Sequence, residues 1–100
     1  MVVGVIRIDL RLFEIHSLKQ KRSQVSRLLN RLRSKFPVSV AEIGCLDLLQ
    51  RTVLGGSMTA GTETIVQSVF TNLEDELYSS GMVEIINLAI EYLHYGEDVR

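Results

Sequence analysis

The stretch from Ser17 to Phe36, SLKQKRSQVSRLLNRLRSKF, constrains the fold of this chain most strongly. Its apolar residues recur at the spacing of one helical face, and they are Leu18, Val25, Leu28, Leu29, Leu32 and Phe36. Ser17 is followed three residues later by Gln20, a capping-box pair that satisfies backbone donors at a helix start. We therefore predict an amphipathic helix whose apolar face must be covered by other elements.

The remaining surface of this helix is basic. It carries seven basic residues and no acidic one: Lys19, Lys21, Arg22, Arg27, Arg31, Arg33 and Lys35. The chain through Phe36 has nine basic and two acidic residues, whereas the chain from Pro37 onward has two basic and ten acidic residues. The net charge of −1 therefore hides a strong charge asymmetry, and the overall charge neither favours nor excludes an anionic partner.

The segment before this helix alternates with a period of two, which predicts a long strand with one buried face. One face carries Val2, Gly4, Ile6, Ile8, Leu10 and Leu12, and the other carries Val3, Val5, Arg7, Asp9, Arg11 and Phe13. The second face is apolar at its start and charged at its end.

The rest of the chain supplies three more strands and a second helix. We expect the first helix to end at Phe36, because Pro37 disfavours helical geometry in the residue before it. The expected elements are strands at Val38–Ile43 and Arg51–Thr59, a helix at Glu63–Tyr78 closed by a left-handed Gly81, and a strand at Met82–Leu93. Gly55-Gly56 indicates a bulge or a close backbone approach. In the last strand, Ile86, Leu88, Ile90 and Tyr92 share one side.

This β-α-β-β-α-β order predicts an α+β fold of ferredoxin-like type. It is a two-layer sandwich, with a four-stranded antiparallel sheet and two helices on one face. We expect a single domain over residues 1–100, in which 94–100 form a loose polar tail. We expect the two helices to be antiparallel, which would bring Lys19–Arg22 next to Glu74–Glu76.

Two hypotheses explain the basic helix. Its first turns carry cations where the helix dipole is already positive, so an anion is expected there. In the first hypothesis this anion is a phosphate or the backbone of RNA or of a ribosomal particle, bound by Ser17, Lys19, Lys21, Arg22, Arg27, Arg31 and Lys35. In the alternative the protein is an oligomeric structural or regulatory domain, and the basic helix is a solvated, ion-paired face.

The sheet face not covered by helices suggests self-association. Val3 and Val5, with apolar residues of other strands, would form an exposed patch there, and an isologous homodimer would cover it. RRM-type domains stack bases on aromatic side chains of their central strands. Here the second face of the first strand carries Val3, Val5, Arg7, Asp9 and Arg11, and the third strand has no aromatic residue. Base recognition by this face is therefore disfavoured.

The sequence offers no catalytic set, metal site or cofactor motif, so we expect a non-enzymatic protein. Cys45, His16, His94 and Asp47 are the candidates for nucleophilic or metal chemistry, but their spacing fits no known ligand pattern. A single cysteine excludes an intrachain disulfide and fits a reducing compartment. With no signal peptide and no apolar stretch of about 20 residues, we expect a cytoplasmic protein that does not enter a membrane.

Several segments resemble the YlxP-like family of small bacterial proteins over nearly the whole chain. They are Ser17-Leu18-Lys19-Gln20-Lys21-Arg22, Phe36-Pro37-Val38-Ser39-Val40-Ala41-Glu42, Asp47 and Gln50-Arg51. The chain departs from the family pattern at Leu49 and over Gly55-Gly56-Ser57. The resemblance implies a ferredoxin-like fold, a cytoplasmic bacterial protein of uncharacterised activity and a link to translation. It implies no catalytic residues.

Overall fold

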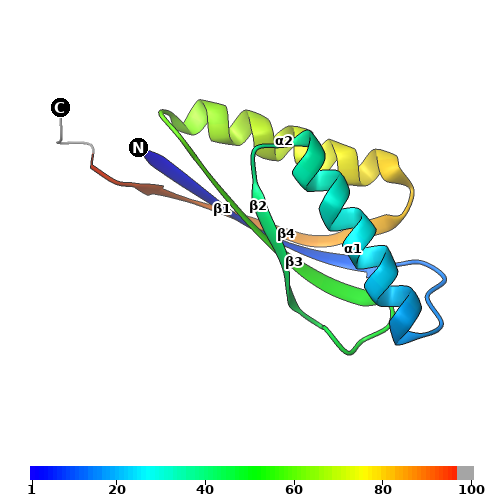
Figure 1. Ribbon diagram of the computed structural model, residues 1–100. Coiled ribbons are helices and arrows are strands. Elements are labelled where there is room, and N and C mark those ends of the chain that lie inside the picture. Colours follow the sequence, from blue (N-terminus) through cyan, green and yellow to red (C-terminus); the bar gives the residue numbers. More distant parts are fainter. Residues whose placement is uncertain (97–100) are drawn as a thin grey trace.

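The computed structural model describes residues 1–96 and has the order β-α-β-β-α-β (Figure 1). The elements are β1 (Val2–Leu12), α1 (Leu18–Lys35), β2 (Ser39–Gly44), β3 (Arg51–Ala60), α2 (Glu63–Ser80) and β4 (Val83–His94). Both helices begin where the sequence predicts, and α2 continues past the predicted Tyr78 to Ser80. Ser17 and Thr62 are the N-caps, Phe36 is extended before Pro37, and Gly81 is left-handed with φ of 69°.

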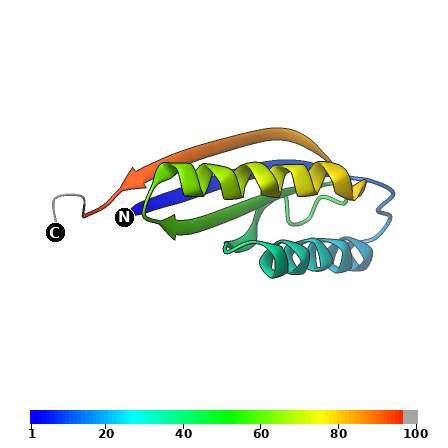
Figure 2. The same ribbon diagram turned by 90° about the horizontal axis from the view of Figure 1, so that it is seen from above.

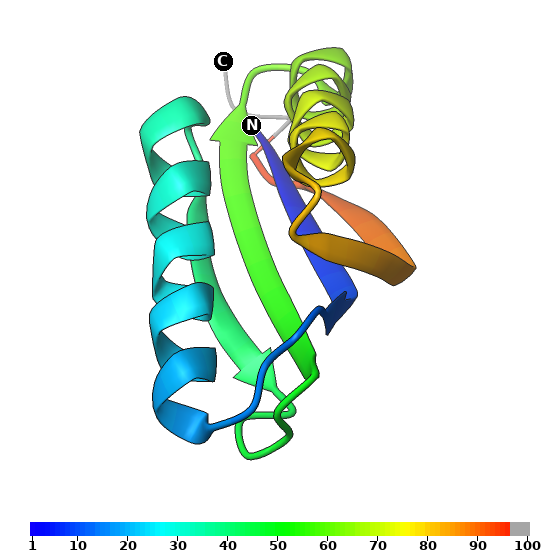
Figure 3. The same ribbon diagram turned by 90° about the vertical axis from the view of Figure 1, so that its right-hand side faces the viewer.

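The four strands form one antiparallel sheet in the order β2-β3-β1-β4, with β1 and β3 at its centre. Both helices lie on the same face: α1 covers β2, and α2 covers β1 and β4 and also contacts β3 (Figure 3). This arrangement confirms the ferredoxin-like sandwich. Among residues 1–96, neither helix is apolar enough over its length to cross a bilayer.

The core lies between the sheet and the helices. The face of β1 that begins at Val2 is buried as the alternation predicts, and it packs against the apolar stripes of both helices. The α1 stripe contributes Val25, Leu28 and Leu32, and the α2 stripe contributes Val66, Phe70, Leu73 and Leu77. The opposite face of the sheet remains open to solvent.

Glycines mark the places where elements approach most closely. A Cβ atom on Gly4 would lie 2.2 Å from Cγ1 of Val66, so α2 can cross β1 only where β1 has no side chain. Gly55 and Gly56 fulfil the close-approach alternative of the sequence prediction. The side chain of Ile43 covers Gly55 on the open face, and Ile6 and Val40 contact Gly56 in the core.

The irregularities of the sheet lie in its two edge strands, β2 and β4. The register of β3 with β1 is continuous through Gly55-Gly56, whereas shifts occur in β2 between Glu42 and Gly44 and in β4 opposite Asp9 and Leu10. The shift in β4 corrects one prediction. Ile85, Leu88, Ile90 and Tyr92 pack against the core, but Ile86 is 40% exposed because the extra residue breaks the alternation.

The two ends of the described chain meet at one tip of the sheet (Figure 2). The Tyr95 N–H donates to the Met1 carbonyl at 2.9 Å, and the Met1 ammonium donates to the Tyr95 carbonyl at 3.0 Å. The prediction of a loose tail from residue 94 is therefore wrong for His94 and Tyr95, because β4 continues to pair with the start of β1. Gly96 is the last described residue, and 97–100 of the predicted tail lie outside the described residues.

Candidate nucleic-acid interface

The start of α1 is fixed by a capping arrangement close to the predicted one. The Gln20 N–H donates to Ser17 Oγ at 3.1 Å, and the Gln20 side-chain oxygen accepts the N–H of His16 at 2.8 Å. The side-chain amide of Gln20 also donates to the Glu14 carbonyl at 3.3 Å. Because its hydroxyl caps the helix, Ser17 contributes to the geometry of the predicted anion site rather than offering a free donor.

Lys21 belongs to the interior of the protein. Its side chain is 1% exposed, and its Nζ donates to the carbonyls of Cys45 and of Leu46, the latter at 3.1 Å. Nζ also lies 3.2 Å from Oε2 of Glu42, which accepts the hydroxyl of Thr52 at 2.6 Å. Lys21 therefore joins α1 to β2, to β3 and to the loop between them.

The burial of Lys21 removes one member of the predicted site. We expected Lys21 to help bind an external anion, but its charge is compensated by Glu42 and its donors point at backbone carbonyls. The reason is its position on the margin of the apolar stripe, from which the aliphatic stem follows the core inward. Cys45 has a positive φ of 58°, and its carbonyl is one of the two that Lys21 holds.

Two further cations of the predicted site are paired with α2. Arg31 Nε donates to Glu76 Oε1 at 2.6 Å, and Lys35 Nζ donates to the same oxygen at 2.8 Å. These hydrogen bonds, first from Lys35 and then from Arg31, hold the pKa of Glu76 below its ordinary value. Arg33, on the same part of α1, donates to the Val40 carbonyl at 2.8 Å.

These ion pairs correct the predicted arrangement of the helices. We expected the acidic end of α2 to meet Lys19–Arg22, but Glu76 meets the last turns of α1 instead. The helices cross at an angle, with the end of α1 directed at the second half of α2 (Figures 1 and 3). The twist of the sheet explains this crossing, since helices that follow different strands diverge with those strands.

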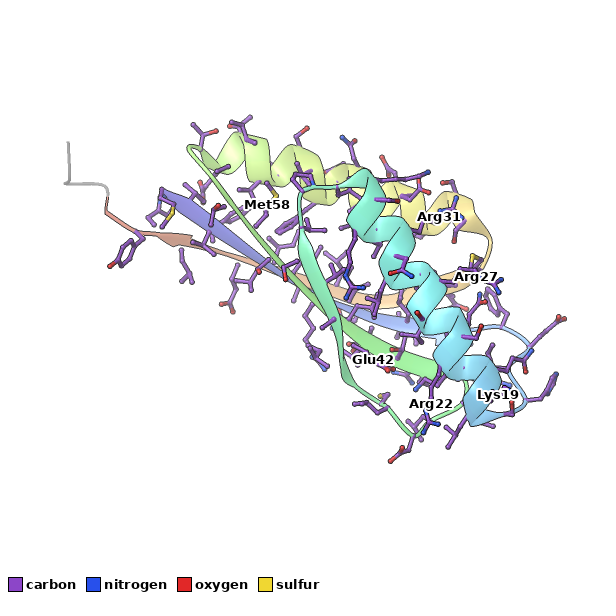
Figure 4. The ribbon with its side chains drawn as sticks, in the orientation of Figure 1. Lys19, Arg22, Arg27, Arg31, Glu42 and Met58 are labelled. Carbon is purple, nitrogen blue, oxygen red and sulfur yellow. The ribbon has the colours of Figure 1, made fainter. Side chains whose placement is uncertain are left out.

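Three cations of the predicted site remain exposed on the outer face of α1: Lys19, Arg22 and Arg27. None of the hydrogen bonds or ion pairs formed within residues 1–96 involves their side chains. Ser23, Ser26 and Asn30 lie between them on the same face and are also exposed. In Figure 4, Lys19 and Arg22 lie near the start of α1, and Arg27 projects from its middle away from the sheet. We call these six residues the α1 outer face.

The sequence pattern does not predict Glu42 and Thr52 as partners of Lys21. A weak signal was available, because Lys21 falls at the edge of the apolar arc and Glu42 is an acid inside a short β-branched strand. Which cations of α1 are paired depends on how α1 and α2 cross. Helical periodicity does not determine that crossing.

The residues considered for catalysis form no cluster with the spacing of a metal or nucleophilic site within residues 1–96. Cys45 is half-buried and Asp47 is exposed in the β2–β3 loop, His16 is exposed before α1, and His94 lies 3.2 Å from Glu63 at the other tip. Within residues 1–96, no group of three or more potential metal-ligating side chains converges.

Comparison with known proteins agrees with this fold and identifies the family. Residues 3–90 match the family described as "Protein of unknown function (DUF503)". The chain belongs to the DUF503 family. It is 34% identical over 77 residues to "Uncharacterized protein YlxP" of Bacillus subtilis (strain 168), covering 73% of this chain and 84% of that protein. The YlxP-like resemblance of the sequence is thereby confirmed.

Solved structures of low sequence identity share the DUF503 architecture. "Structural Genomics, protein YJCS" superposes with a TM-score of 0.60 at 12% identity, over 92% of this chain and 99% of that chain. The designed protein Foldit4 gives 0.51 at 14% identity, over 93% and 96%. A putative chlorite dismutase, TA0507, gives 0.51 at 11% identity, over 92% of this chain but only 44% of its own. At these identities the likeness concerns the fold alone.

Proposed function

We propose that this protein is a cytoplasmic, non-enzymatic RNA-binding module that contacts the sugar–phosphate backbone of RNA or of a ribosomal particle through the α1 outer face. The observation that carries the proposal is the division of the cations on α1. Arg31 and Lys35 have an acidic partner on α2, whereas Lys19, Arg22 and Arg27 extend into solvent from a helix without a single acid. The single cysteine of the chain fits the reducing cytoplasm.

Electrostatics supports an external anion at this face. Lys19 and Arg22 lie in the first turns of α1, where the helix dipole is positive and no acidic residue is present. Each cation placed there costs a few tenths of a kcal/mol, and a bound phosphate would reverse the sign of that contribution. The ion-paired alternative explains Arg31 and Lys35 but leaves Lys19, Arg22 and Arg27 without a role.

The chemistry of the face favours backbone contact over base reading. Arginine and lysine are the usual phosphate ligands, and the hydroxyls of Ser23 and Ser26 with the amide of Asn30 are additional donors to phosphate and sugar oxygens. On the open face of the sheet, the strands present no aromatic side chain, since Tyr92 of β4 packs against the core. Recognition by stacked bases is therefore disfavoured.

The salt dependence of binding to a fluorescein-labelled RNA hairpin, followed by fluorescence anisotropy, tests the proposal. If Lys19, Arg22 and Arg27 each contact a phosphate, log K should fall with log[salt] with a slope of about −2 to −3. The affinity should then decrease about 16- to 64-fold between 50 and 200 mM salt. An affinity that does not change over this range would contradict the proposal.

Two double variants with equal net charge separate local contact from overall charge. Arg22→Gln/Arg27→Gln removes two positive charges from the α1 outer face, and Thr64→Glu/Gln67→Glu adds two negative charges at exposed positions of α2. The first should weaken hairpin binding at least about tenfold and reduce the salt slope by about 2. The second should change binding little. Equal effects of the two variants would refute a site on α1.

A further inference from the structure

The open face of the sheet contains a hollow with apolar lining at its centre. Its volume is about 440 Å³. The floor is formed by small residues, Ala41 of β2, Gly55 of β3 and Ala89 of β4, and the exposed side chains of Val5 and Ile43 rise beside it. This hollow lies on the opposite side of the sheet from α1, so the RNA-binding proposal does not use it.

We propose that a second copy of this chain covers the open face, in an isologous homodimer packed sheet to sheet. Val5 is 38% exposed, Ile43 is 55% exposed and Leu93 at the end of the same face is 55% exposed. Apolar side chains that project beside a floor of small residues are suited to packing against an identical surface, because each copy offers both projections and a hollow.

The charges of the open face favour a copy of the same chain over a strongly charged partner. Three basic and three acidic residues share this face in the strand register: Arg7, Arg11, Arg51, Asp9, Glu84 and Glu91. Arg11 already lies 3.6 Å from Glu84, and Arg7 lies 3.5 Å from Asp9. Because positive and negative charges balance, an identical face is electrostatically complementary, whereas RNA would be repelled by the three carboxylates.

A specific pair of charges determines the position of the symmetry axis. Arg7 and Glu91 both line the hollow, and they lie diagonally across β1 and β4, since Arg7 faces Ala89 and Glu91 faces Val5. Sheet-to-sheet packing requires the two-fold axis to lie in the plane between the two faces, and it sets two points opposite each other when it bisects the line between them at right angles. Such an axis places Arg7 of each copy opposite Glu91 of the other. The central apolar residues, Val5 and Ala89, then meet near the axis.

The two partners of this pair are available for it. The Arg7 side chain is 58% exposed, although its guanidinium lies 3.5 Å from Asp9. Glu91 is exposed, and no ion pair formed within residues 1–96 includes its carboxylate. Two symmetry-related Arg–Glu pairs would flank the apolar centre. Dimer interfaces usually have this arrangement, with an apolar core and a polar rim.

The open face is large enough for a stable dimer. The three long strands have 10, 11 and 12 residues, and β2 adds a fourth, shorter strand of 6. At about 3.4 Å per residue and about 4.8 Å per strand, the face measures roughly 35 by 19 Å, or about 500–700 Å². Specific interfaces bury about 600–1,000 Å² on each partner. Because side chains project from the sheet, the accessible area of the open face is larger than this flat estimate.

Analytical ultracentrifugation of the full-length chain in the absence of RNA tests the dimer. The wild-type protein should sediment at twice its mass of 11.3 kDa at micromolar concentration. Arg7→Glu sets two carboxylates against each other at each contact across the axis, and Glu91→Arg sets two guanidinium groups against each other there. Each variant alone should therefore raise the dimer dissociation constant at least about tenfold. Far-UV circular dichroism should confirm that both variants remain folded.

Mixing the two variants gives the decisive result. In a heterodimer of Arg7→Glu with Glu91→Arg, one contact across the axis pairs the two introduced side chains and the other pairs the two native ones. The repulsion between like charges is then absent from both contacts, so the mixture should dimerise as the wild type does. Wild-type protein that stays monomeric up to about 100 μM, variants that dimerise normally, or a mixture that stays monomeric would each overturn the proposal. A monomeric wild type whose open face binds an apolar dye would assign the hollow to a small molecule instead.

Discussion

At the scale of single residues, two lysines on the first turn of α1 have opposite roles. Lys19 is exposed, whereas Lys21 is 1% exposed and is surrounded by Glu42 and the carbonyls of Cys45 and Leu46. A buried ammonium without these partners would be strongly destabilising, so the network is a requirement of the fold. The difference arises from a rotation of about 200° around the helix between the two positions.

This difference predicts unequal effects of similar substitutions. Lys21→Met keeps the aliphatic stem but leaves the half-buried Glu42 carboxylate without its cation, and we expect it to lower the free energy of unfolding by about 2–4 kcal/mol. Lys19→Met should change it by no more than about 0.5 kcal/mol. Urea unfolding followed by circular dichroism measures both values.

A double-mutant cycle separates the ion pair from packing. Lys21→Met/Glu42→Gln removes both charges and keeps an acceptor for Thr52, so its destabilisation should be smaller than the sum of the single effects by at least about 1 kcal/mol. Additive effects would mean that Lys21 and Glu42 contribute independently.

Glu76 predicts a pH dependence of stability. Because Lys35 and Arg31 lower the pKa of Glu76 in the folded state, this carboxylate stabilises the protein at pH values above its unfolded pKa. As the pH falls through the lower pKa of the folded state, this contribution is lost, because the carboxyl group is then protonated in both the folded and the unfolded protein. Glu76→Gln should therefore destabilise the protein at neutral pH, and the difference from wild type should shrink in acid.

Asp75→Asn is the matched control for Glu76, because Asp75 is the exposed neighbouring acid and forms no ion pair within residues 1–96. It should leave the pH dependence of the melting temperature unchanged. If Glu76→Gln lowered the melting temperature by the same amount at pH 3 and pH 7, the pairing with Arg31 and Lys35 would contribute no measurable stability.

At the scale of elements, the position of α2 is determined by one small residue of β1. A Cβ on Gly4 would lie 2.2 Å from Val66 Cγ1 and 2.9 Å from Phe70 Cε2, and both side chains belong to the apolar stripe of α2. The helix axis can therefore approach the sheet more closely at Gly4 than over Ile6 or Ile8. Both of those residues are at most 3% exposed.

Gly4→Ala should push α2 away from β1. Overpacking of this kind costs about 1–3 kcal/mol, with loss of packing at Val66 and Phe70. Gly61→Ala is the control, because a Cβ there meets no atom within 4 Å, and it should be neutral or stabilising by up to about 1 kcal/mol. Thermal unfolding by calorimetry compares the two. Equal stability of Gly4→Ala and wild type would show that α2 adjusts without cost.

The same elements indicate what the sequence could and could not predict. Strand and helix bounds followed from alternation, capping and Pro37, because these signals are local. The exposure of Ile86 was not predictable, since a bulge has no composition signal in a β-branched run. The pairing of Glu76 with Arg31 and Lys35 depends on the crossing angle of two helices 28 residues apart in the chain, counted from Lys35 to Glu63. That angle is a property of the twisted sheet.

At the scale of the whole molecule, the two proposed surfaces lie on opposite sides of the sheet. The helices cover one face, so a dimer formed through the other face would leave both copies of α1 exposed and pointing outward. The charged residues of the α1 outer face are all basic, whereas the open face is balanced in charge. The charge of each surface therefore disfavours the partner that we propose for the other surface. The dimer would present two RNA-binding sites, one on each copy of α1.

Two outward sites predict a dependence of affinity on RNA length. A long RNA can contact both copies of α1, so that the second contact becomes intramolecular, whereas a short hairpin can occupy only one. Arg7→Glu, which opposes dimer formation, should weaken binding to the long RNA at least about tenfold and leave hairpin affinity unchanged. Because Arg7 lies outside the α1 outer face, the hairpin measurement controls for the altered charge. Weakening of both RNAs to the same extent would mean that Arg7 contributes to RNA binding directly, and an unchanged affinity for the long RNA would mean that the two sites act independently.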